Sequence, residues 1–297
     1  MIQPGEIFRA FAVFVEPPSA EHAAVAETLS LGEVPSRSEH TDLFDFQLFP
    51  FASVYLGAEG MQGGEARDRI ADFWRVLELE PPNDPDHLTV LLAAYGALVD
   101  HAEDKANADA ENWRYVGQVF LHEFLLSWVP LFLARLRGKA SSFYGAWADQ
   151  LSSVLASEPL DERLAGTLAA ALREADPLPD PREEGGEAFL QGLLAPVRSG
   201  FILTRDDLSA MADSLGLGRR VGERKYVLKS LLSQDAPRSL EALAGFAEEA
   251  SQGHATSEML EVTRDWWARR AMGSRDLLSE LASESVPLDL ATDPAGA

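Results

Sequence analysis

The sequence predicts an all-α fold, and two observations support this prediction. Apolar residues recur at three- and four-residue spacing along most of the chain, which is the period of a helix that buries one face. Alternating runs of β-branched residues, which are typical of strands, are almost absent. The 297 residues are 46% hydrophobic, which is ordinary for a globular protein, and a chain of this length has about two domains.

Proline and glycine divide the first part of the chain into helices. A first short helix should end at Pro17-Pro18. An aromatic-rich helix contains Pro50, which removes a backbone donor and should kink or split it. Asp84 as N-cap and Pro85 at the first helical position predict the start of another helix. Helices are therefore expected over residues 7–15, 20–31, 38–56, 64–79, 85–98, 110–127, 130–137, 141–157 and 160–174.

Residues 176–187 predict a domain boundary. They hold three prolines, two glycines and a cluster of charges, a composition that cannot bury enough apolar surface to order itself. We expect a domain of residues 1–177, a linker of residues 178–187 and a helical C-terminal extension of residues 188–297. Thr204 and Asp207 resemble a capping box within this extension. Its helices are expected over residues 188–194, 206–215, 221–233, 237–250 and 257–272, with a frayed tail after about residue 281.

The chain is strongly acidic, with 25 Lys and Arg against 48 Asp and Glu and a net charge of -23. Such a chain repels the phosphate backbone, so we expect no nucleic-acid partner. The acidity is concentrated in residues 1–177, which hold 12 basic and 28 acidic side chains. An acidic surface suits a basic peptide as partner, although net charge that keeps a protein in solution would explain the same composition.

Cysteine is absent from the chain, which excludes disulfides, cysteine-ligated metals and thiol nucleophiles. The first residues lack a basic leader with a small-residue cleavage site, so we expect no signal peptide and a cytoplasmic location. The longest apolar stretch, residues 119–136, is interrupted by polar residues and proline. A lipid-spanning helix would have to bury these groups, so we expect a buried helix pair and no membrane insertion.

Motifs for an enzyme are incomplete in this sequence. His122-Glu123 resembles the start of a zinc-protease motif, but Leu126 occupies the position of the second histidine. Residues 216–222 have one residue too many between the second and third glycines for a dinucleotide loop. We expect no enzyme, no metal and no cofactor. An enzyme with a metal site assembled in space from His87, His122 and a carboxylate remains an alternative.

Four groups of residues in the first part of the chain form a recognisable combination. An aromatic helix ending in Tyr55 leads to the junction Asn83-Asp84-Pro85-Asp86-His87-Leu88. Then follow residues 122–132, with His122 and Trp128, and residues 143–147, with Tyr144. Over about residues 1–175 this combination resembles the TorD/NarJ family of cytoplasmic redox-enzyme maturation chaperones, whose members carry an acidic-Pro-Asp-His turn and a His-x-x-Leu-x-x-Trp helix. Asp84 stands where that family usually has Glu, and residues 178–297 exceed the family's usual length.

The resemblance implies a molecular chaperone for the assembly and maturation of a molybdopterin-containing oxidoreductase subunit. Such a chaperone holds the precursor, often by its twin-arginine leader, until the cofactor is inserted. A leader with paired arginines and an apolar stretch needs carboxylates and an apolar groove between helices. The acidic charge and the many aromatic residues of the first part agree with that need.

The residues that carry the resemblance are the candidates for partner binding. They are Asp84, Asp86, His87, Tyr55, His122 and Trp128. Each has a structural alternative: Asp86 and His87 could begin a helix, where the dipole favours anions, and the other buried-type side chains could belong to the core. A helical adaptor for an unrelated basic peptide also remains an open interpretation.

Overall fold

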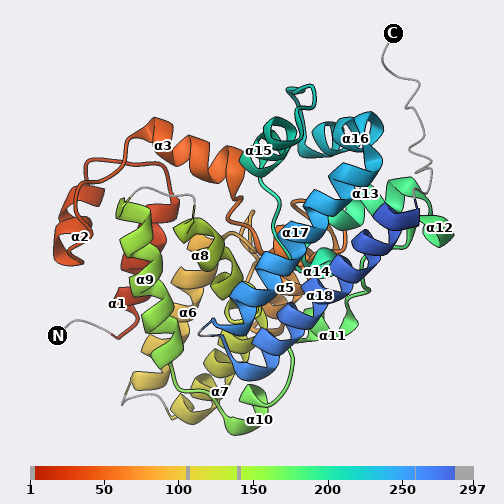
Figure 1. The fold of residues 1–297 in the computed structure, drawn as a ribbon. Helices are drawn as coiled ribbons and strands as arrows, with labels where there is room; N and C mark the ends of the chain where they lie inside the picture. Colours follow the sequence, from red (N-terminus) through yellow and green to blue (C-terminus); the bar gives the residue numbers. More distant parts are fainter. Residues whose placement is uncertain (1–3, 105–107, 139–141, 258, 285–297) are drawn as a thin grey trace. The chain divides into compact units, whose positions relative to one another are not determined.

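The computed structural model describes residues 4–104, 108–138, 142–257 and 259–284, and these residues confirm the all-α class (Figure 1). The described residues form no β-strand, and their single isolated bridge pairs Phe51 with His87. The chain divides into two compact units, each of which is discontinuous in sequence. Unit 1 comprises Met1–Val54, Gln62–Arg173 and Glu258–Thr263, and unit 2 comprises Tyr55–Met61, Glu174–Ser257 and Arg264–Ala297.

In unit 1, helix α6 packs against both α1 and α7, and α8 packs against α9. Short 3-10 (η1) and π-helical (η2, η3) turns continue three of the helices, and the division between the units falls inside α4. The elements in order are α1 (Glu6–Ala12), η1 (Val13–Val15), α2 (His22–Thr28), α3 (Arg37–Thr41), η2 (Asp42–Gln47), α4 (Ala52–Leu56), α5 (Gly64–Val76), α6 (Leu88–Glu103), α7 (Ala110–Phe120), η3 (Leu121–Leu125), α8 (Val129–Arg137), α9 (Ser142–Ser157), α10 (Glu162–Ala165) and α11 (Ala170–Glu174).

Aromatic side chains fill the core of unit 1. The rings of Phe44 and Tyr144 meet edge to face with centroids 5.1 Å apart, a geometry that aromatic pairs favour. Trp147 is fully buried, and its indole nitrogen donates to the carbonyl of Phe11 at 3.1 Å. The aromatic residues that the sequence distributes over several helices therefore hold α1, η2 and α9 together.

Several predicted helices differ from the observed ones, and the last, expected over residues 257–272, is α18, which runs from Glu261 to Glu284. Pro50 splits the aromatic helix as predicted, since η2 ends at Gln47 and α4 begins at Ala52. The helix expected over residues 160–174 is broken into α10 and α11. The helix expected from Asp84 begins only at Leu88, so Asp84 is not its N-cap. Pairing of residues 86–88 with residues 50–52 keeps that backbone extended and delays the helix.

Unit 2 is organised around two long helices, α17 and α18, which run side by side (Figure 1). The hydroxyl of Ser251 on α17 donates to the carbonyl of Ala268 on α18 at 2.9 Å. The predicted capping box of Thr204 and Asp207 is confirmed at the start of α15. The helices are α12 (Pro181–Glu184), α13 (Gly186–Leu194), α14 (Pro196–Ser199), α15 (Arg205–Leu215), α16 (Arg224–Gln234), α17 (Ala236–Ala255) and α18 (Glu261–Glu284).

The segment of residues 176–187 is ordered, contrary to the expectation from its composition. Leu178 is buried in the core of unit 2, and α12 follows it. Arg182 on α12 pairs with Glu280 at 2.6 Å and with Glu284 at 3.0 Å, both on α18. Burial of Leu178 and the ion pairs of Arg182 therefore stabilise this segment in spite of its prolines and glycines. Separate folding of residues 1–177 and 188–297 stays a prediction.

The apolar stretch at residues 119–136 forms η3 and α8 and is largely buried within unit 1. Among the residues that the structure describes, no single helix has the length and hydropathy to cross a bilayer. The pair Ala110–Leu125 and Val129–Arg137, bent by 49°, would meet both criteria only if its two helices were taken together.

Candidate functional site

The turn of residues 84–87 is held in unit 1 by the residues that precede and begin α4. The amide of Ala52 donates to the carbonyl of Asp86 at 2.9 Å, and the amide of Leu88 donates to the carbonyl of Pro50 at 2.8 Å. The rings of Phe51 and His87 meet edge to face with centroids 4.7 Å apart. Backbone pairing and one ring contact therefore fix this turn.

The three polar residues of the turn have different environments. The Asp86 side chain is buried, with 1% of the residue exposed, and its Oδ2 accepts from the amide of Ser53 at 3.2 Å. This carboxylate therefore caps α4 rather than the helix that follows it in sequence. The Asp84 side chain is exposed, and the His87 side chain is 16% exposed, with Nδ1 3.8 Å from Oε1 of Glu16. Only Asp84 and part of His87 face outward.

Burial lowers the pKa of His87, and the nearby carboxylates of Glu16, Asp84 and Asp86 only partly oppose this effect. A histidine with a lowered pKa is neutral at neutral pH. One of its ring nitrogens then donates a hydrogen bond and the other accepts one. The negative charge at the turn is therefore not cancelled by His87.

Replacing Asp86 by alanine should destabilise the protein, whereas replacing Asp84 should not. Asp86→Ala leaves the buried amide of Ser53 without its partner, which costs about 1–3 kcal/mol. Asp84→Ala removes an exposed side chain and should change the free energy of unfolding by less than about 0.5 kcal/mol. Urea denaturation of both variants measures the difference. Equal losses in the two variants would show that Asp86 does not cap α4.

His122 and Glu123 lie on the π-helical segment η3, and their side chains form hydrogen bonds to residues at the break between α10 and α11. The Nδ1 of His122 lies 3.1 Å from Oε1 of Glu123, and its Nε2 lies 3.0 Å from the carbonyl oxygen of Thr167. Oε2 of Glu123 accepts from the amide of Ala170 at 2.8 Å. Thus the pair that resembled a fragment of a zinc motif fixes a loop, and it explains why residues 160–174 do not form one helix.

The same contacts shift the pKa values of both side chains. Burial by itself lowers the pKa of His122, but its bonds to Glu123 and Thr167 outweigh burial and leave the pKa raised. Burial by itself raises the pKa of Glu123, but its bonds to His122 and Ala170 outweigh burial and leave the pKa lowered. Both directions favour the charged pair.

The stability that His122 contributes should therefore decrease as the pH rises. A raised pKa in the folded state means that the contribution is complete below the unfolded pKa of about 6.5 and is lost as the pH rises through the folded pKa. Urea denaturation of wild type and His122→Gln at several pH values from 5.5 to about 9 measures it. Taking the difference in the free energy of unfolding between the two proteins removes the contributions of other histidines, such as His87, whose pKa is lowered. A difference that stays constant or grows with pH would contradict the charged pair.

Trp128 and Tyr55 are buried members of different units. Trp128 is 0% exposed in unit 1, and its indole nitrogen donates to the carbonyl of Phe124 at 2.8 Å. Tyr55 is 1% exposed in unit 2, where burial raises the pKa of its hydroxyl. Within the part of the chain that the structure describes, no three His, Asp or Glu side chains are grouped so that they could hold a metal. The structure thus gives no support to a site built from His87 and His122.

An exposed surface that the sequence patterns did not single out lies just before the turn. Val76 at the end of α5 is 79% exposed and Leu79 is 49% exposed, and the neighbouring Glu78 and Glu80 are exposed as well. Arg67 of α5 donates to the carbonyl of Asn83 at 2.8 Å and ties this segment to the turn. Together with Asp84, the four residues Val76, Glu78, Leu79 and Glu80 form what we call the acidic-apolar surface. Val76 lies off the apolar face that Ile70, Phe73 and Trp74 share, and it belongs to no motif, so the sequence patterns do not single it out.

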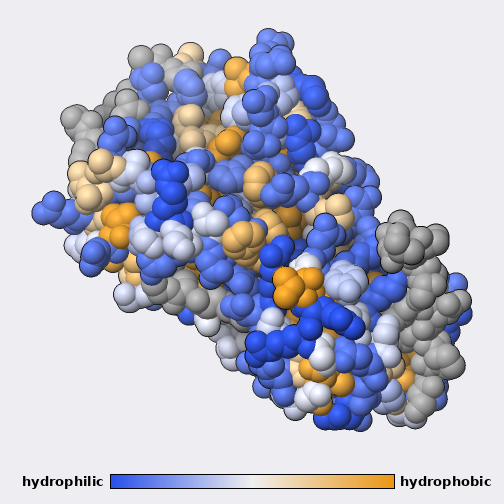
Figure 2. Space-filling model, turned by 90° about the horizontal axis from the view of Figure 1, so that it is seen from above, coloured by the Kyte–Doolittle hydropathy of each residue, from blue (hydrophilic) through white to orange (hydrophobic). Residues whose placement is uncertain are grey.

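The other large apolar side chains that are exposed in the described residues are Phe46, Met61, Tyr115, Val221 and Tyr226, of which Val221 and Tyr226 lie close together in sequence. On the face shown in Figure 2, hydrophilic residues predominate and apolar residues occur in small groups. Single exposed apolar residues are normal on a protein surface. Val76 and Leu79 lie in a segment of nine residues that also holds three exposed carboxylates. This grouping indicates a binding surface more strongly than a single exposed apolar residue does.

Comparison with known proteins confirms the resemblance to the TorD/NarJ family over part of the chain. The profile of the family described as nitrate reductase delta subunit matches residues 20–134. "Chaperone protein TorD" of Vibrio vulnificus (strain YJ016) is 32% identical over 92 residues, which are 29% of this chain and 42% of that protein. "Chaperone protein TorD" of Psychrobacter sp. (strain PRwf-1) is 29% identical over 134 residues, which are 41% of this chain and 60% of that protein.

The matches cover 42% to 60% of the length of these relatives. No solved structure matches the chain. The matched segment includes the turn of residues 84–87, η3 and most of α8, whereas the group of residues 143–147 lies outside it.

Proposed function

We propose, on the premise that residues 20–134 are related to the TorD/NarJ family, that this protein is a chaperone and not an enzyme. Its client would be the precursor of a molybdopterin-containing oxidoreductase subunit, held in the cytoplasm until the cofactor is inserted. The observation that carries the proposal is the family match across the acidic turn and the His122–Trp128 segment. The name of the curated relatives, chaperone protein TorD, supports the same class of function.

The part of the client that is bound first would be a twin-arginine leader. Guanidinium groups pair with carboxylates, and the apolar stretch behind them needs exposed apolar side chains. The acidic-apolar surface offers both kinds of contact: the carboxylates of Glu78, Glu80 and Asp84, and the side chains of Val76 and Leu79. Glu16, which faces His87, adds a further carboxylate.

The six predicted binding residues would divide their roles. Asp84 and His87 are accessible and would contact the leader. Asp86, His122 and Trp128 are buried in unit 1, so we propose that they hold the elements that carry the surface in place. Tyr55 is buried in unit 2, and we propose the same supporting role for it there.

Charge reversal of the acidic-apolar surface should weaken binding of a leader peptide. In the variant Glu78→Lys, Glu80→Lys, Asp84→Lys, three attractions become repulsions, and we expect the affinity to fall by about 10-fold or more. The matched control is Glu241→Lys, Glu248→Lys, Glu249→Lys on α17, which changes the net charge equally and also affects exposed residues. Titration of both variants with a twin-arginine leader peptide, at one salt concentration, is the measurement.

The control separates a local surface from the general attraction of an acidic protein. An equal loss of affinity in the two triple variants would mean that net charge alone draws in the peptide. Unchanged affinity in both variants would place leader recognition elsewhere. A basic peptide without the apolar stretch should bind the wild type more weakly than the leader, because it cannot use Val76 and Leu79; equal binding would favour the adaptor interpretation.

A further inference from the structure

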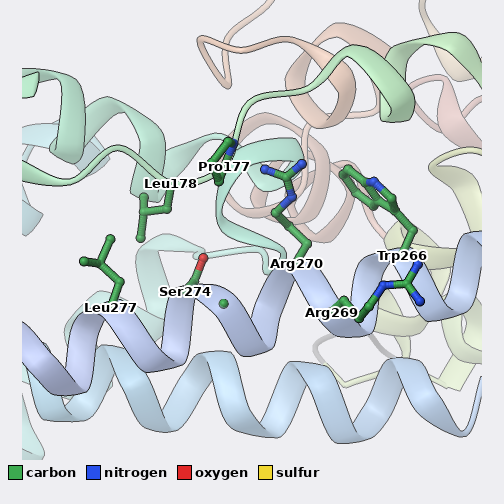
Figure 3. A pocket seen from close by; sticks show the side chains of 8 residues that line it. Pro177, Leu178, Trp266, Arg269, Arg270, Ser274 and Leu277 are labelled. Atoms are coloured by element: carbon green, nitrogen blue, oxygen red, sulfur yellow. The ribbon is translucent and has the colours of Figure 1, made fainter.

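Unit 2 contains a pocket of about 300 Å³ between α18 and the segment that precedes α12 (Figure 3). Pockets that hold small molecules have volumes of about 300–1,000 Å³. The side chains of α18 that face the pocket recur at one-turn spacing, so they form a continuous stripe on one face of the helix. The lining residues are Pro177, Leu178, Trp266, Arg269, Arg270, Gly273, Ser274 and Leu277.

Two hydrogen-bond donors in this pocket have no partner among the residues that the structure describes. Arg270 donates from Nη2 to the carbonyl of Ala175 at 2.7 Å, but its buried Nη1 is unpaired. Ser274, four residues further on the same helix, is 2% exposed, and its hydroxyl is also unpaired. Buried donors without partners are destabilising and rare. Two of them one helical turn apart in the same cavity indicate a place for an acceptor.

The charges around the pocket favour an anion as that acceptor. Burial lowers the pKa of Arg270, the charge of Asp176 opposes this effect, and the charge of Arg198 adds to it. Arg269 also lines the pocket. The two charged side chains that line the pocket, Arg269 and Arg270, are both basic, in a chain whose net charge is -23, and an anion placed there would stabilise the charged form of Arg270.

The remaining lining residues are apolar. The Arg270 guanidinium carbon lies 4.7 Å from the ring centroid of Trp266, so this contact helps to position Arg270. Leu178 and Leu277 lie toward the other end of the pocket (Figure 3). A ligand that fits must therefore combine one acidic group with an apolar body.

We propose that this pocket binds a small carboxylate that carries an apolar or aromatic group. The two carboxylate oxygens would accept from Nη1 of Arg270 and from the hydroxyl of Ser274, and the apolar group would lie toward Leu178 and Leu277. Two open donors match a carboxylate, whereas a phosphate would leave a further charged oxygen against apolar side chains. The carboxylate can come from a free organic acid or from the last residue of a peptide. The proposal does not depend on the chaperone function.

Calorimetric titration of the full chain with three probes tests the chemistry. N-acetyl-L-phenylalanine represents the last residue of a peptide, 3-phenylpropionate represents a free acid, and N-acetyl-L-phenylalaninamide is the neutral control. We expect at least one acid to bind and the amide to bind about 10-fold or more weakly. Tighter binding of the acetylated amino acid indicates the peptide source, and tighter binding of phenylpropionate indicates the free acid. No binding of either acid, or equal binding of the amide, overturns the proposal.

Two variants test the residues. Arg270→Gln should weaken binding of the better acid by about 30-fold or more, and Ser274→Ala by about 10-fold. Ser274→Ala should also raise the unfolding midpoint, because it removes an unpaired buried hydroxyl. If Arg270→Gln does not fold, Ser274→Ala decides the outcome. Arg264→Gln and Ser283→Ala, which lie on α18 outside the lining, are the matched controls, and wild-type affinity in Ser274→Ala would overturn the proposal.

Discussion

A Gly96→Val variant is expected to lose about 3 kcal/mol or more of folding stability. Gly96 on α6 faces the backbone of Gly5 at the start of α1, and a Cβ at position 96 would lie 2.6 Å from the carbonyl oxygen of Gly5. Because the obstacle is backbone, the two helices would have to move apart. That movement would also break the bond from the amide of Gly5 to Asp100, now 2.8 Å long.

Urea denaturation followed by circular dichroism measures this loss. Gly145→Val is the matched control, since Gly145 also lies inside a helix and a Cβ there would meet nothing within 4 Å. The control should change stability by less than about 1 kcal/mol. Similar losses in the two variants would mean that helix propensity, and not the close approach of α1 and α6, determines the effect.

Replacing Trp128 by alanine should cost about 3–5 kcal/mol, because it empties a large fully buried site. The ring meets Phe132 edge to face with centroids 5.7 Å apart. Its indole nitrogen donates a hydrogen bond to the carbonyl of Phe124. Both contacts lie where η3 passes into α8, so the variant should loosen the connection between these elements. We expect client binding to fall only as far as the folded fraction falls.

Trp113→Ala is the comparison for this prediction. Trp113 on α7 is only partly buried and stacks on His101 with centroids 5.2 Å apart, so its replacement should cost less. Binding titrations at a temperature where Trp128→Ala is still folded complete the test. A folded Trp128→Ala variant that no longer binds a leader peptide would show that the residue contacts the client, and the supporting role proposed for it would be wrong.

Features that depend on nearby residues could be predicted from the sequence. Pro50 lacks an amide proton, so it interrupts a helix wherever it falls beyond the first turn. Thr204 and Asp207 lie three residues apart, so their reciprocal capping bonds require no distant partner. The all-α class follows from the apolar period in the same way.

Features that depend on distant residues could not be predicted. The predicted start of α6 at Pro85 is three residues too early, because the backbone of residues 86–88 pairs with residues 50–52. Order in residues 176–187 depends on the pairing of Arg182 with Glu280, 98 residues away in sequence. Neither the local sequence nor its composition shows which distant residues will pair with these segments.

The candidate site shows the same limit. Motif spacing selected Asp86, His122 and Trp128, and the structure shows that each makes a structural hydrogen bond in a buried place. A motif identifies residues that a fold requires as readily as residues that a partner contacts. The exposed Val76 and Leu79 belong to no motif, so only the structure identified the surface that they form with the neighbouring carboxylates.

The most direct test of the proposed function is to purify this chain, by an affinity tag, from cells that make a molybdopterin oxidoreductase of the same organism. The captured material is analysed by mass spectrometry, and its molybdenum and pterin content is measured. The proposal predicts that the catalytic subunit is captured without its cofactor and that deleting the chain lowers the yield of active enzyme. Capture of no oxidoreductase subunit, or an unchanged yield of active enzyme after deletion, would contradict it.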